Sequence, residues 1–586
     1  MSSPKSPPLE TSTGRTPFFQ STGSGALYGW HHKPPDNLPS KGIGVVLCPP
    51  LGFEQIHAHR AYRRWAESFA EGGFHAVRFD YRHTGNSSGD GPAASCVSSY
   101  LADILSIADK LLSQGRKGVA FVGCRFGATL AVLAAKERPS SMLILWNPIT
   151  SGRRYARELR AIAAMSAAHQ LPASNTVECA GFEITSTSMD EIATLEIKNT
   201  DLKNVLNTLL IDDNIKSKLG GTEGIEKLPS VDDSSVEMIL REPHNTQVPR
   251  VLFRQTCDWL NDKCAEQNSL NSNLKPFALQ YSAKLDAATS DSAESIEIIR
   301  NIPHLVGIHN RCKGVYEQST FVILLNAGSV HSAGPNRLYC QISRALANVG
   351  ISSLRLDLRN LGDSPQGAVE DENHPYPATA TEDVAIAVNW AKQRHPNSKI
   401  ILMGLCSGAH SSLHAALSGL DINQIILINP LTFRWHDGLS LDQGADQNIE
   451  KDRRQFLVLL KNPKTWLKNL LTYEKLAKFV KFFFKFSRSL VSRTAVSSLR
   501  FIGLIKPSQL SADLDSLASR SVAITLVFSS GDPGWSILTK EAGSTASRLV
   551  DSGNISVHFI EEADHTFTLS RSRHQLIAVL QQEILQ

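Results

Sequence analysis

Residues 404–408 read Gly-Leu-Cys-Ser-Gly and directly follow an apolar run at 400–403. This is the G-x-nucleophile-x-G pattern, in which a strand turns so sharply into a helix that only glycine fits beside the reactive side chain. The central residue is Cys406, and a thiolate is a strong nucleophile at neutral pH that forms a thioester with an acyl group. The pattern therefore predicts covalent acyl chemistry at Cys406.

A cysteine in this position requires a base that deprotonates the thiol and an acid that orients the base. The segment 524–534 is an apolar strand with Asp532 at its carboxyl end, and the last strand, in 557–567, is followed by His565 in a loop. Such sites use the order nucleophile, acid, base along the chain. We predict that Cys406 is the nucleophile, Asp532 the orienting acid, and His565 the base and later the acid. The competing candidates are Asp363, Asp564, His331 and His558.

The negative charge of a tetrahedral intermediate requires hydrogen-bond donors beside the nucleophile. One predicted donor is the backbone N–H of Ser407, at the start of the helix. The second should come from the loop after the strand at 321–325, where Gly328 is the best single choice.

A second copy of the turn, Gly-Cys-Arg-Phe-Gly at 123–127, has Arg125 at its centre. A guanidinium stays protonated and cannot act as a nucleophile, and Cys124 lies one residue away from the apex. Two interpretations remain open. Either this half is a structural partner without activity, or Arg125, with His244 near the end of the same half, binds a phosphate or carboxylate at a helix N-terminus.

Other segments also repeat between the two halves of the chain. The residues Arg-Phe-Asp-Tyr-Arg-His-Thr-Gly-Asn-Ser at 78–87 correspond to Arg-Leu-Asp-Leu-Arg-Asn-Leu-Gly-Asp-Ser at 355–364, and an apolar strand ends in Asn-Pro at 147–148 and again at 429–430. Apolar runs that alternate with helical segments indicate buried parallel strands joined by right-handed crossovers. The repeat therefore predicts an α/β protein with two tandem, doubly wound units.

The predicted helices include 61–71 and 338–349, and the β-rich stretches 16–32 and 296–312 should supply antiparallel strands at the sheet edges. An insertion follows the Asn-Pro strand in each half, where a cap over the site is expected. We predict a disordered tail at 1–15, an N-terminal domain at 16–265, a linker at 266–294, a C-terminal domain at 295–586, and caps at 151–202 and 431–519.

These residues resemble the α/β-hydrolase fold, and more narrowly the bacterial serine-aminopeptidase-like hydrolases found with exosortase and capsular polysaccharide systems. The segments that carry the resemblance most clearly are 326–337, 404–409 and 429–435. It covers most of both halves and implies hydrolase chemistry, although relatives often have serine where this chain has Cys406. Dienelactone hydrolases and polyhydroxyalkanoate synthases also place a cysteine in this turn, but neither has the tandem arrangement.

The composition, 42% hydrophobic and 20% charged, is that of a soluble globular protein, and a formal charge of +4 provides no broad basic face for nucleic acid. Nine scattered cysteines without a C-x-x-C pair indicate free thiols in a reducing cytoplasm. No apolar run reaches the length of a membrane-spanning helix. No metal or redox cofactor is expected, because neither a ligand cluster nor a dinucleotide fingerprint is present.

The segment 451–493 is strongly basic, with twelve Lys or Arg against two acidic residues and with eight aromatic residues interspersed. It is either a lid whose lysines are simply solvated or a docking surface for an acidic partner. An acyl carrier protein suits a thioester-handling cysteine better than an anionic membrane surface does.

We therefore expect a cytoplasmic enzyme that forms an acyl-Cys406 intermediate from an ester or thioester and passes the acyl group to water. One alternative is an acyltransferase or condensing enzyme of specialised-metabolite or polysaccharide biosynthesis that acts on carrier-bound acyl groups. The other is a scaffold in which both halves bind and neither reacts.

Overall fold

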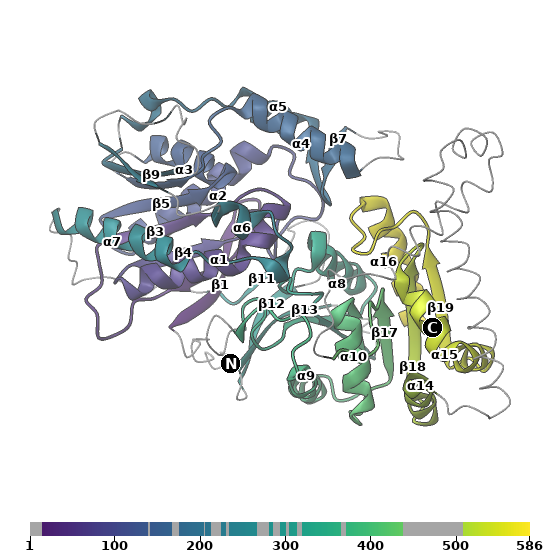
Figure 1. Ribbon diagram of the computed structural model, residues 1–586. Helices are drawn as coiled ribbons and strands as arrows, with labels where there is room; N and C mark the ends of the chain where they lie inside the picture. The colour runs from purple at the N-terminus through teal and green to yellow at the C-terminus, as the bar shows by residue number, and fades with distance from the viewer. Residues whose placement is uncertain are drawn as a thin grey trace, which may run out of the picture.

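Each half of the chain builds its own mixed β-sheet (Figure 1). The N-terminal half, in purple to teal, lies beside the C-terminal half, in green to yellow. The computed structural model describes residues 14–138, 141–166, 175–203, 205–212, 219, 224–229, 234–266, 280–284, 293–300, 304–312, 319–364, 371–436 and 508–586.

The N-terminal sheet has the order β1-β2-β4-β3-β5-β6-β9-β10. The β1–β2 and β2–β4 pairs are antiparallel and the other pairs are parallel. The strands are β1 (Arg15–Thr22), β2 (Gly25–His32), β3 (Ile43–Cys48), β4 (His75–Phe79), β5 (Gly118–Cys124), β6 (Met142–Trp146), β9 (Asn207–Asp212) and β10 (Ile225–Pro229).

The C-terminal sheet has the order β11-β12-β13-β15-β14-β16-β17-β18-β19. Apart from the additional edge strand β11, this order and the pattern of antiparallel and parallel pairs repeat those of the first sheet. The strands are β11 (Ser282–Lys284), β12 (Ala293–Arg300), β13 (His304–Arg311), β14 (Thr320–Leu325), β15 (Ser352–Asp357), β16 (Lys399–Leu405), β17 (Gln424–Ile428), β18 (Ala523–Ser529) and β19 (Ile555–Ile560).

Helices cover both faces of each sheet, because successive strand residues point to opposite sides. In β3, Val45 belongs to the core beneath one group of helices, and Val46 belongs to the core beneath the other group. The first group is α1 (Phe53–Glu71), α6 (Ser234–Ile239) and α7 (Arg250–Glu266), and the second includes α2 (Cys96–Ser113) and α3 (Phe126–Glu137).

The C-terminal sheet is covered in the same way, with two separate cores. On one face lie α8 (Leu338–Asn348) and α16 (Ser570–Leu585), and on the other lie α9 (Ala380–Arg394), α10 (Ser407–Leu417), α14 (Gln509–Ser519) and α15 (Pro533–Asp551). The short 3-10 turns η2 (Pro243–Asn245) and η3 (Pro335–Arg337) precede α7 and α8.

The predicted first cap, 151–202, contains helices and a small hairpin. It consists of α4 (Gly152–Ser166), β7 (Thr176–Cys179), β8 (Phe182–Thr185), α5 (Ser186–Thr194) and η1 (Asn199–Leu202). Most of the predicted second cap, including the basic segment 451–493, lies outside the described residues, as do residues 1–13 of the predicted tail.

The predicted antiparallel edges at 16–32 and 296–312 correspond to the pairs β1–β2 and β12–β13. Helix α1 begins eight residues before the predicted 61, at Phe53. Its first turns carry the buried polar residues Glu54 and Gln55, which bond Arg125 and Asp80, so the apolar period is broken there. Strand β11 lies inside the predicted linker 266–294. Its Ser-Ala-Lys sequence is too short to predict a strand, and pairing with β12 holds it in an extended conformation.

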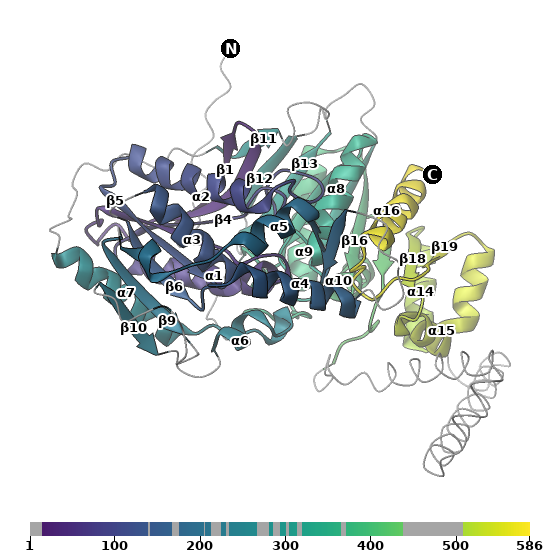
Figure 2. The ribbon, with the colours of Figure 1, turned by 90° about the horizontal axis from the view of Figure 1, so that it is seen from above.

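The two halves are joined through their antiparallel edges, where β1 lies beside β11 and β12 when the molecule is seen from above (Figure 2). The backbone N–H of Phe19 donates to the carbonyl of Gln280 at 2.6 Å. One apolar cluster combines residues of both halves, so this contact is part of the buried structure: Phe19, Ala26, Tyr28, Trp30, Ala283, Ile296, Val306 and Ile308.

A buried ion pair also crosses this boundary. Arg78 Nη2 lies 2.5 Å from Asp363 Oδ1, and Trp30 Nε1 donates to Asp363 Oδ2 at 2.9 Å. Burial raises the pKa of Asp363, but the charges of Arg78 and His59 outweigh burial and hold the pKa well below its usual range. The carboxylate is therefore charged and depends on partners from the other half.

Replacement of Arg78 by methionine should lower the free energy of unfolding by about 3–5 kcal/mol, because it leaves the Asp363 carboxylate buried without its main counter-charge. Chemical denaturation measures this loss. The control is Arg138→Met, which removes a pair with Asp109 whose side chains are 32% and 55% exposed and which should cost less than about 1 kcal/mol. Equal losses in the two variants would contradict the prediction.

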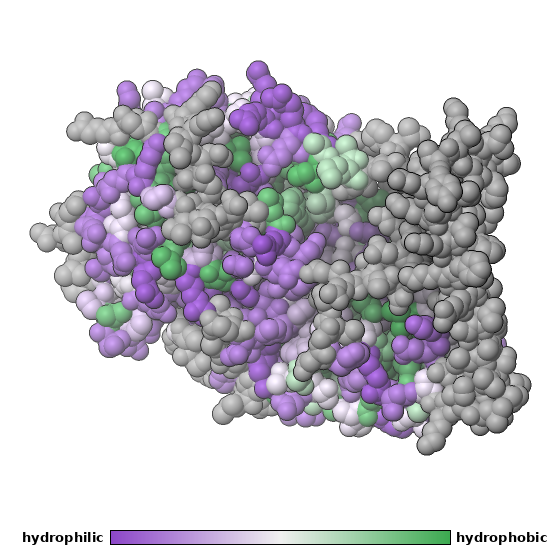
Figure 3. Space-filling view, viewed as in Figure 1, coloured by the Kyte–Doolittle hydropathy of each residue, from purple (hydrophilic) through white to green (hydrophobic). Residues whose placement is uncertain are grey.

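Hydrophilic side chains cover most of the described surface in the space-filling view. A group of hydrophobic side chains is exposed near α4 and β7 (Figure 3). Among the described helices, none is both long enough and apolar enough to cross a membrane.

Candidate active site

Cys406 lies at the carboxyl end of β16, in the turn that leads into α10. Its backbone has φ 57° and ψ −113°, a left-handed conformation that is costly for a residue with a side chain. A Cβ on Gly404 would lie 2.2 Å from the backbone of Gly408, and a Cβ on Gly408 would lie 2.5 Å from the carbonyl oxygen of Leu325. The two glycines therefore permit the sharp turn that sequence analysis predicts.

The same turn is kept at Arg125, which has φ 51° and ψ −120°. The backbone N–H of Arg125 donates to the carbonyl of Trp146 at 2.9 Å, as that of Cys406 donates to Ile428 at 2.9 Å. A tyrosine hydroxyl accepts from the preceding N–H in both halves, Tyr62 at Cys124 and Tyr339 at Leu405. The N-terminal half thus retains the geometry of the turn with a different side chain at its apex.

His565 and Asp532 are brought together at the carboxyl ends of β19 and β18. His565 Nδ1 lies 2.6 Å from Asp532 Oδ2. The other carboxylate oxygen, Oδ1, accepts from the backbone N–H of Gly534 at 2.9 Å and caps α15. The carboxylate is therefore fixed in position by the helix that follows it.

The His565 ring also interacts with Cys406. The Nε2 atom is buried and makes no well-aligned hydrogen bond to the described residues. Burial lowers the pKa of His565, but the electrostatic interaction with nearby Cys406, together with the hydrogen bond and charge of Asp532, outweighs burial and raises this pKa to about 10. The raised pKa favours the protonated form of the His565 ring at neutral pH.

The loop that carries His565 is held by hydrogen bonds to its backbone carbonyls. Asn429 Nδ2 donates to the carbonyl of His565 at 2.8 Å, and Asn336 Nδ2 donates to that of Thr566 at 3.4 Å. Arg573 Nη1 donates to the carbonyls of the next two residues. The repeated Asn-Pro at the end of β17 therefore positions the histidine, a role that the repeat alone did not reveal.

Cys406 differs from the other thiols in its exposure. None of the nine cysteines forms a disulfide; eight are buried and Cys406 is half-buried. The Tyr376 hydroxyl lies 3.9 Å from Cys406 Sγ, and the Tyr376 ring stacks on Trp435 with centroids 4.2 Å apart. His410 packs edge-on against Tyr376, and burial, helped by His414 and Arg434, lowers the pKa of His410 to about 3. On this side the thiol therefore faces the aromatic rings of Tyr376 and Trp435, and the nearby His410 is uncharged at neutral pH.

The two predicted oxyanion donors differ in whether their N–H group already has a hydrogen-bond acceptor. Among the described residues, none accepts a hydrogen bond from the Ser407 N–H. The Gly328 N–H donates to the Ser407 side-chain oxygen at 2.8 Å. The Gly328 N–H can therefore bind an oxyanion only when that contact is exchanged, whereas the Ser407 N–H is available.

The competing acids and bases have other partners. Asp363 pairs with Arg78, and His331 stacks on His59 with ring centroids 4.2 Å apart. His558 Nε2 lies 2.9 Å from Glu583, and Asp564 accepts from the Thr568 backbone N–H at 2.6 Å. In the described part of the chain, these four residues make no hydrogen bond, ion pair or ring contact with Cys406.

Arg125 is held by two carboxylates of its own half, Glu54 at 2.9 Å and Glu158. Burial raises the pKa of Glu54 to about 7 although Arg125 opposes the shift. His244 lies in η2, next to Pro243, whose carbonyl accepts from Asn373. Arg125 bonds these carboxylates rather than His244, and an anion at Arg125 would have to displace them. The anion site therefore remains a prediction.

Tyr376 and Trp435 are absent from the predicted site. Tyr376 lies in the loop between β15 and α9, and Trp435 follows β17 beyond the Asn-Pro pair. Neither loop has a periodic pattern that would place it beside Cys406. In the described part of the chain, no group of three or more His, Cys, Asp or Glu residues could hold a metal ion.

Comparison with known proteins gives one family match. Residues 55–202 match the model of the family described as serine aminopeptidase, S33. The matched segment contains Arg125 rather than Cys406. The chain therefore resembles these α/β-hydrolases in the half whose turn has Arg125 at its apex, and the match agrees with the α/β-hydrolase fold that the sequence predicts.

No curated protein matches the chain. Among solved structures, an α/β serine hydrolase homologue from Coxiella burnetii is 14% identical, with a TM-score of 0.28, and covers 51% of this chain and 100% of its own. Est1E from Butyrivibrio proteoclasticus is 13% identical, with a TM-score of 0.32, and covers 43% and 99%. A dienelactone hydrolase from Anabaena variabilis is 10% identical, with a TM-score of 0.30, and covers 49% and 95%.

Proposed function

We propose that the C-terminal half is an acyl-cysteine enzyme that hydrolyses an acyl ester or thioester, with Cys406 as nucleophile, His565 as base and acid, and Asp532 as the orienting carboxylate. The observation that carries this proposal is the 2.6 Å contact between His565 and Asp532 beside a half-buried thiol in a strained turn. Strained backbone and a strongly shifted histidine pKa are typical of functional sites.

In the first step, the Cys406 thiolate attacks the carbonyl carbon of the substrate and a carbon–sulfur bond forms. The carbonyl electrons move to oxygen, where the Ser407 N–H stabilises the negative charge. As the tetrahedral intermediate collapses, the bond to the leaving alcohol or thiol breaks and the His565 imidazolium donates its proton to the leaving group. The product is a thioester on Cys406.

In the second step, His565 removes a proton from water, and the resulting hydroxide equivalent attacks the thioester carbon. The carbon–sulfur bond then breaks, the carboxylic acid leaves, and Cys406 returns as a thiolate beside the imidazolium. Asp532 keeps Nδ1 bonded throughout, so that Nε2 serves both proton transfers.

A second candidate is acyl transfer to an amine or a carbanion, which attack a thioester more readily than an oxygen ester relative to water. A carrier-bound donor at the basic segment 451–493 remains a prediction, because that segment lies outside the described residues. Addition of a primary amine to the reaction distinguishes the two candidates. Hydrolysis yields free acid, whereas transfer diverts the product to the amide.

Intact-protein mass spectrometry after incubation with a panel of acyl-thioesters tests the proposal directly. The expected result is a mass gain equal to one acyl group that maps to Cys406 and is absent in Cys406→Ala. A protein that gains no mass with any donor and releases no acid would be a binding scaffold.

Tyr376→Phe should lower kcat by about 10-fold to 100-fold with little change in KM, because a hydrogen bond to a charged group contributes about 1.5–3 kcal/mol. Burial and the charge of Cys406 both raise the pKa of Tyr376, so its hydroxyl stays protonated and can donate. Phenylalanine keeps the stack on Trp435. The control is Tyr155→Phe, beside Arg125 in the other half, which should leave steady-state kinetics unchanged.

A further inference from the structure

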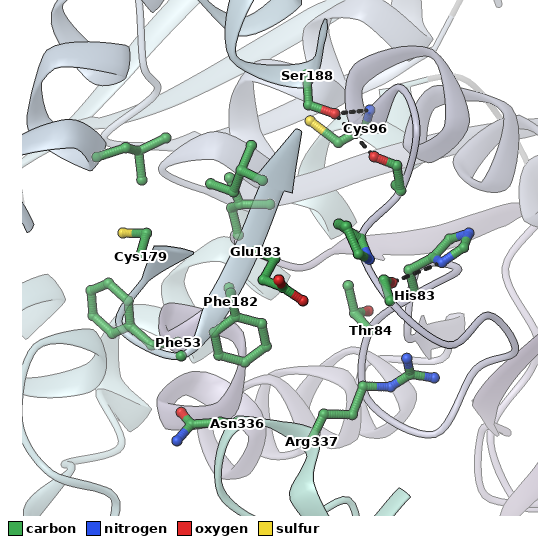
Figure 4. A pocket seen from close by; sticks show the side chains of 18 of the residues that line it. Phe53, His83, Thr84, Cys96, Cys179, Phe182, Glu183, Ser188, Asn336 and Arg337 are labelled. Carbon is green, nitrogen blue, oxygen red and sulfur yellow. Dashed lines mark hydrogen bonds between the residues drawn. The ribbon is translucent and has the colours of Figure 1, made fainter. Parts of the chain in front are cut away.

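A cavity lies where loops of the N-terminal half, the first cap and the C-terminal half meet, away from the proposed catalytic residues (Figure 4). It encloses about 780 Å³, including the part open to solvent. Cys406, His565 and Asp532 do not line it, so the cavity has no role in the proposed reaction steps.

Much of the cavity wall is apolar. The rings of Phe53 and Phe182 lie on one side, opposite Thr84 and His83 (Figure 4). Leu159 of α4 and Ile184 of β8 extend this wall. The hydrophobic effect favours burial of an aliphatic chain along such a surface.

One buried cation lies at the edge that the C-terminal half contributes. Arg337 is 4% exposed, and its guanidinium donates to the carbonyls of Gly85, Ser87 and Gly89. These carbonyls satisfy hydrogen bonds but supply no negative charge. Among the described residues, no carboxylate lies within ion-pair distance of Arg337. The charges of Asp90 and Glu294 act on it only from farther away, because both carboxylates pair with Arg344. A buried cation is favoured by a closer counter-charge. A carboxylate on a ligand would supply it.

The other charged residues of the wall do not provide an equivalent site. Arg573 Nη2 lies 3.4 Å from Glu178 of β7 and is therefore paired. Glu183 faces the cavity (Figure 4) and is half-buried, so it would repel an anion placed next to it. The anionic group of a ligand is thus directed to Arg337, away from Glu183.

The cavity wall is connected to the His565 loop. Asn336 lines the cavity and donates to the Thr566 carbonyl, and Arg573 lines it and donates to the Phe567 carbonyl at 3.3 Å. Asn336 and Arg337 both have positive φ, 51° and 65°, a costly conformation for residues with side chains. A Cβ on Gly181, at the tip of the β7–β8 hairpin, would lie 2.3 Å from the Asn336 side chain. A ligand here would therefore contact residues that hold the catalytic loop.

We propose that this cavity binds an aliphatic carboxylate, with the chain against Phe53 and Phe182 and the carboxylate beside Arg337, and that its occupancy changes the reactivity of Cys406 through Asn336. The binding part stands independently of the proposed function, whereas the reactivity part rests on it.

Binding is tested by calorimetric titration of Cys406→Ala protein, which cannot form an acyl enzyme, with decanoate, 1-decanol and decylamine. Decanoate should bind with one-to-one stoichiometry and at least tenfold more tightly than either analogue. Phe182→Ala should weaken decanoate binding at least tenfold, and Glu183→Gln should leave it equal or tighter. The control is Phe559→Ala, a 47% exposed aromatic of β19 outside the cavity, which should have no effect.

Tighter binding of decylamine, no binding of decanoate, or equal effects of Phe182→Ala and Phe559→Ala would overturn the binding part. These outcomes do not depend on whether Cys406 is catalytic.

The reactivity part is tested in the full chain by the rate at which iodoacetamide alkylates Cys406, with and without saturating decanoate. Decanoate should change this rate at least threefold. In Asn336→Ala the effect of decanoate on the alkylation rate should disappear while decanoate binding persists. Arg573→Lys is a second variant of the contacts to the His565 loop, and it retains the positive charge. An unchanged rate at saturation would overturn the coupling. A thiol that is inert under both conditions would instead contradict the proposed function and leave the binding result valid.

Discussion

Cys406→Ala should lower kcat/KM by about 10⁴-fold to 10⁶-fold, since removal of the nucleophile of a triad leaves only the contributions of binding and the oxyanion donors. The acyl adduct should disappear completely. The measurement is single-turnover kinetics with the thioester that gives the largest mass gain, combined with intact mass. The free energy of unfolding should change far less, because the side chain is half-buried and packs only partly against the core.

The matched control is Cys124→Ala, which removes the thiol next to the apex of the other turn. Cys124 is fully buried between strand and helix residues of its own core. Its removal should cost stability through a small cavity but should leave the turnover of the C-terminal half unchanged. Equal activity losses in the two variants would indicate a general folding defect rather than the loss of a nucleophile.

Cys406→Ser separates the chemical role of the thiol from a packing role. Serine nearly preserves shape, so a residue that only fills space should tolerate it. A nucleophile should not, because a hydroxyl at neutral pH is not ionised by the imidazole in advance and must be deprotonated during attack. Near-normal turnover in Cys406→Ser would contradict the requirement for a thiolate at this position.

The parts of the fold that sequence reasoning predicts well are encoded locally. Gly404 and Gly408 specify the turn because any side chain there would collide with backbone, and the apolar runs before Cys406, Asp532 and His565 mark buried parallel strands. The antiparallel edges follow from their β-rich sequences. The predicted order of nucleophile, acid and base then places all three residues at the same edge of the sheet.

The supports of the site are encoded by contacts between distant segments, which local patterns do not report. Asn336 reaches Thr566 across 230 positions, and Arg78 reaches Asp363 across 285. Tyr376 comes from a loop with no regular period. The early start of α1 could not be predicted for a related reason. Its buried face includes Glu54, a polar residue whose Oε1 accepts a hydrogen bond from the distant Arg125.

The second large effect is expected for Asp532→Asn, which should lower kcat by about 10⁴-fold, as loss of the orienting carboxylate favours the wrong histidine tautomer. Asparagine keeps a side-chain oxygen that can accept from the Gly534 N–H, so the cap of α15 and the fold should be retained. The loss should therefore appear in kcat while the far-UV circular dichroism spectrum and the unfolding midpoint remain close to those of the unmodified protein.

The pH dependence of kcat/KM should also change in a defined direction in Asp532→Asn. Acylation requires the His565 imidazolium to protonate the leaving group, so activity should be lost as pH rises through the pKa of about 10. In Asp532→Asn the imidazolium loses a hydrogen bond and a negative charge that raise this pKa, so the basic limb of kcat/KM should move to lower pH. The control is Asp564→Asn, which alters the carboxylate next to His565 that bonds Thr568 and should leave the limb in place. A limb that moves in Asp564→Asn but not in Asp532→Asn would assign the orienting role to Asp564.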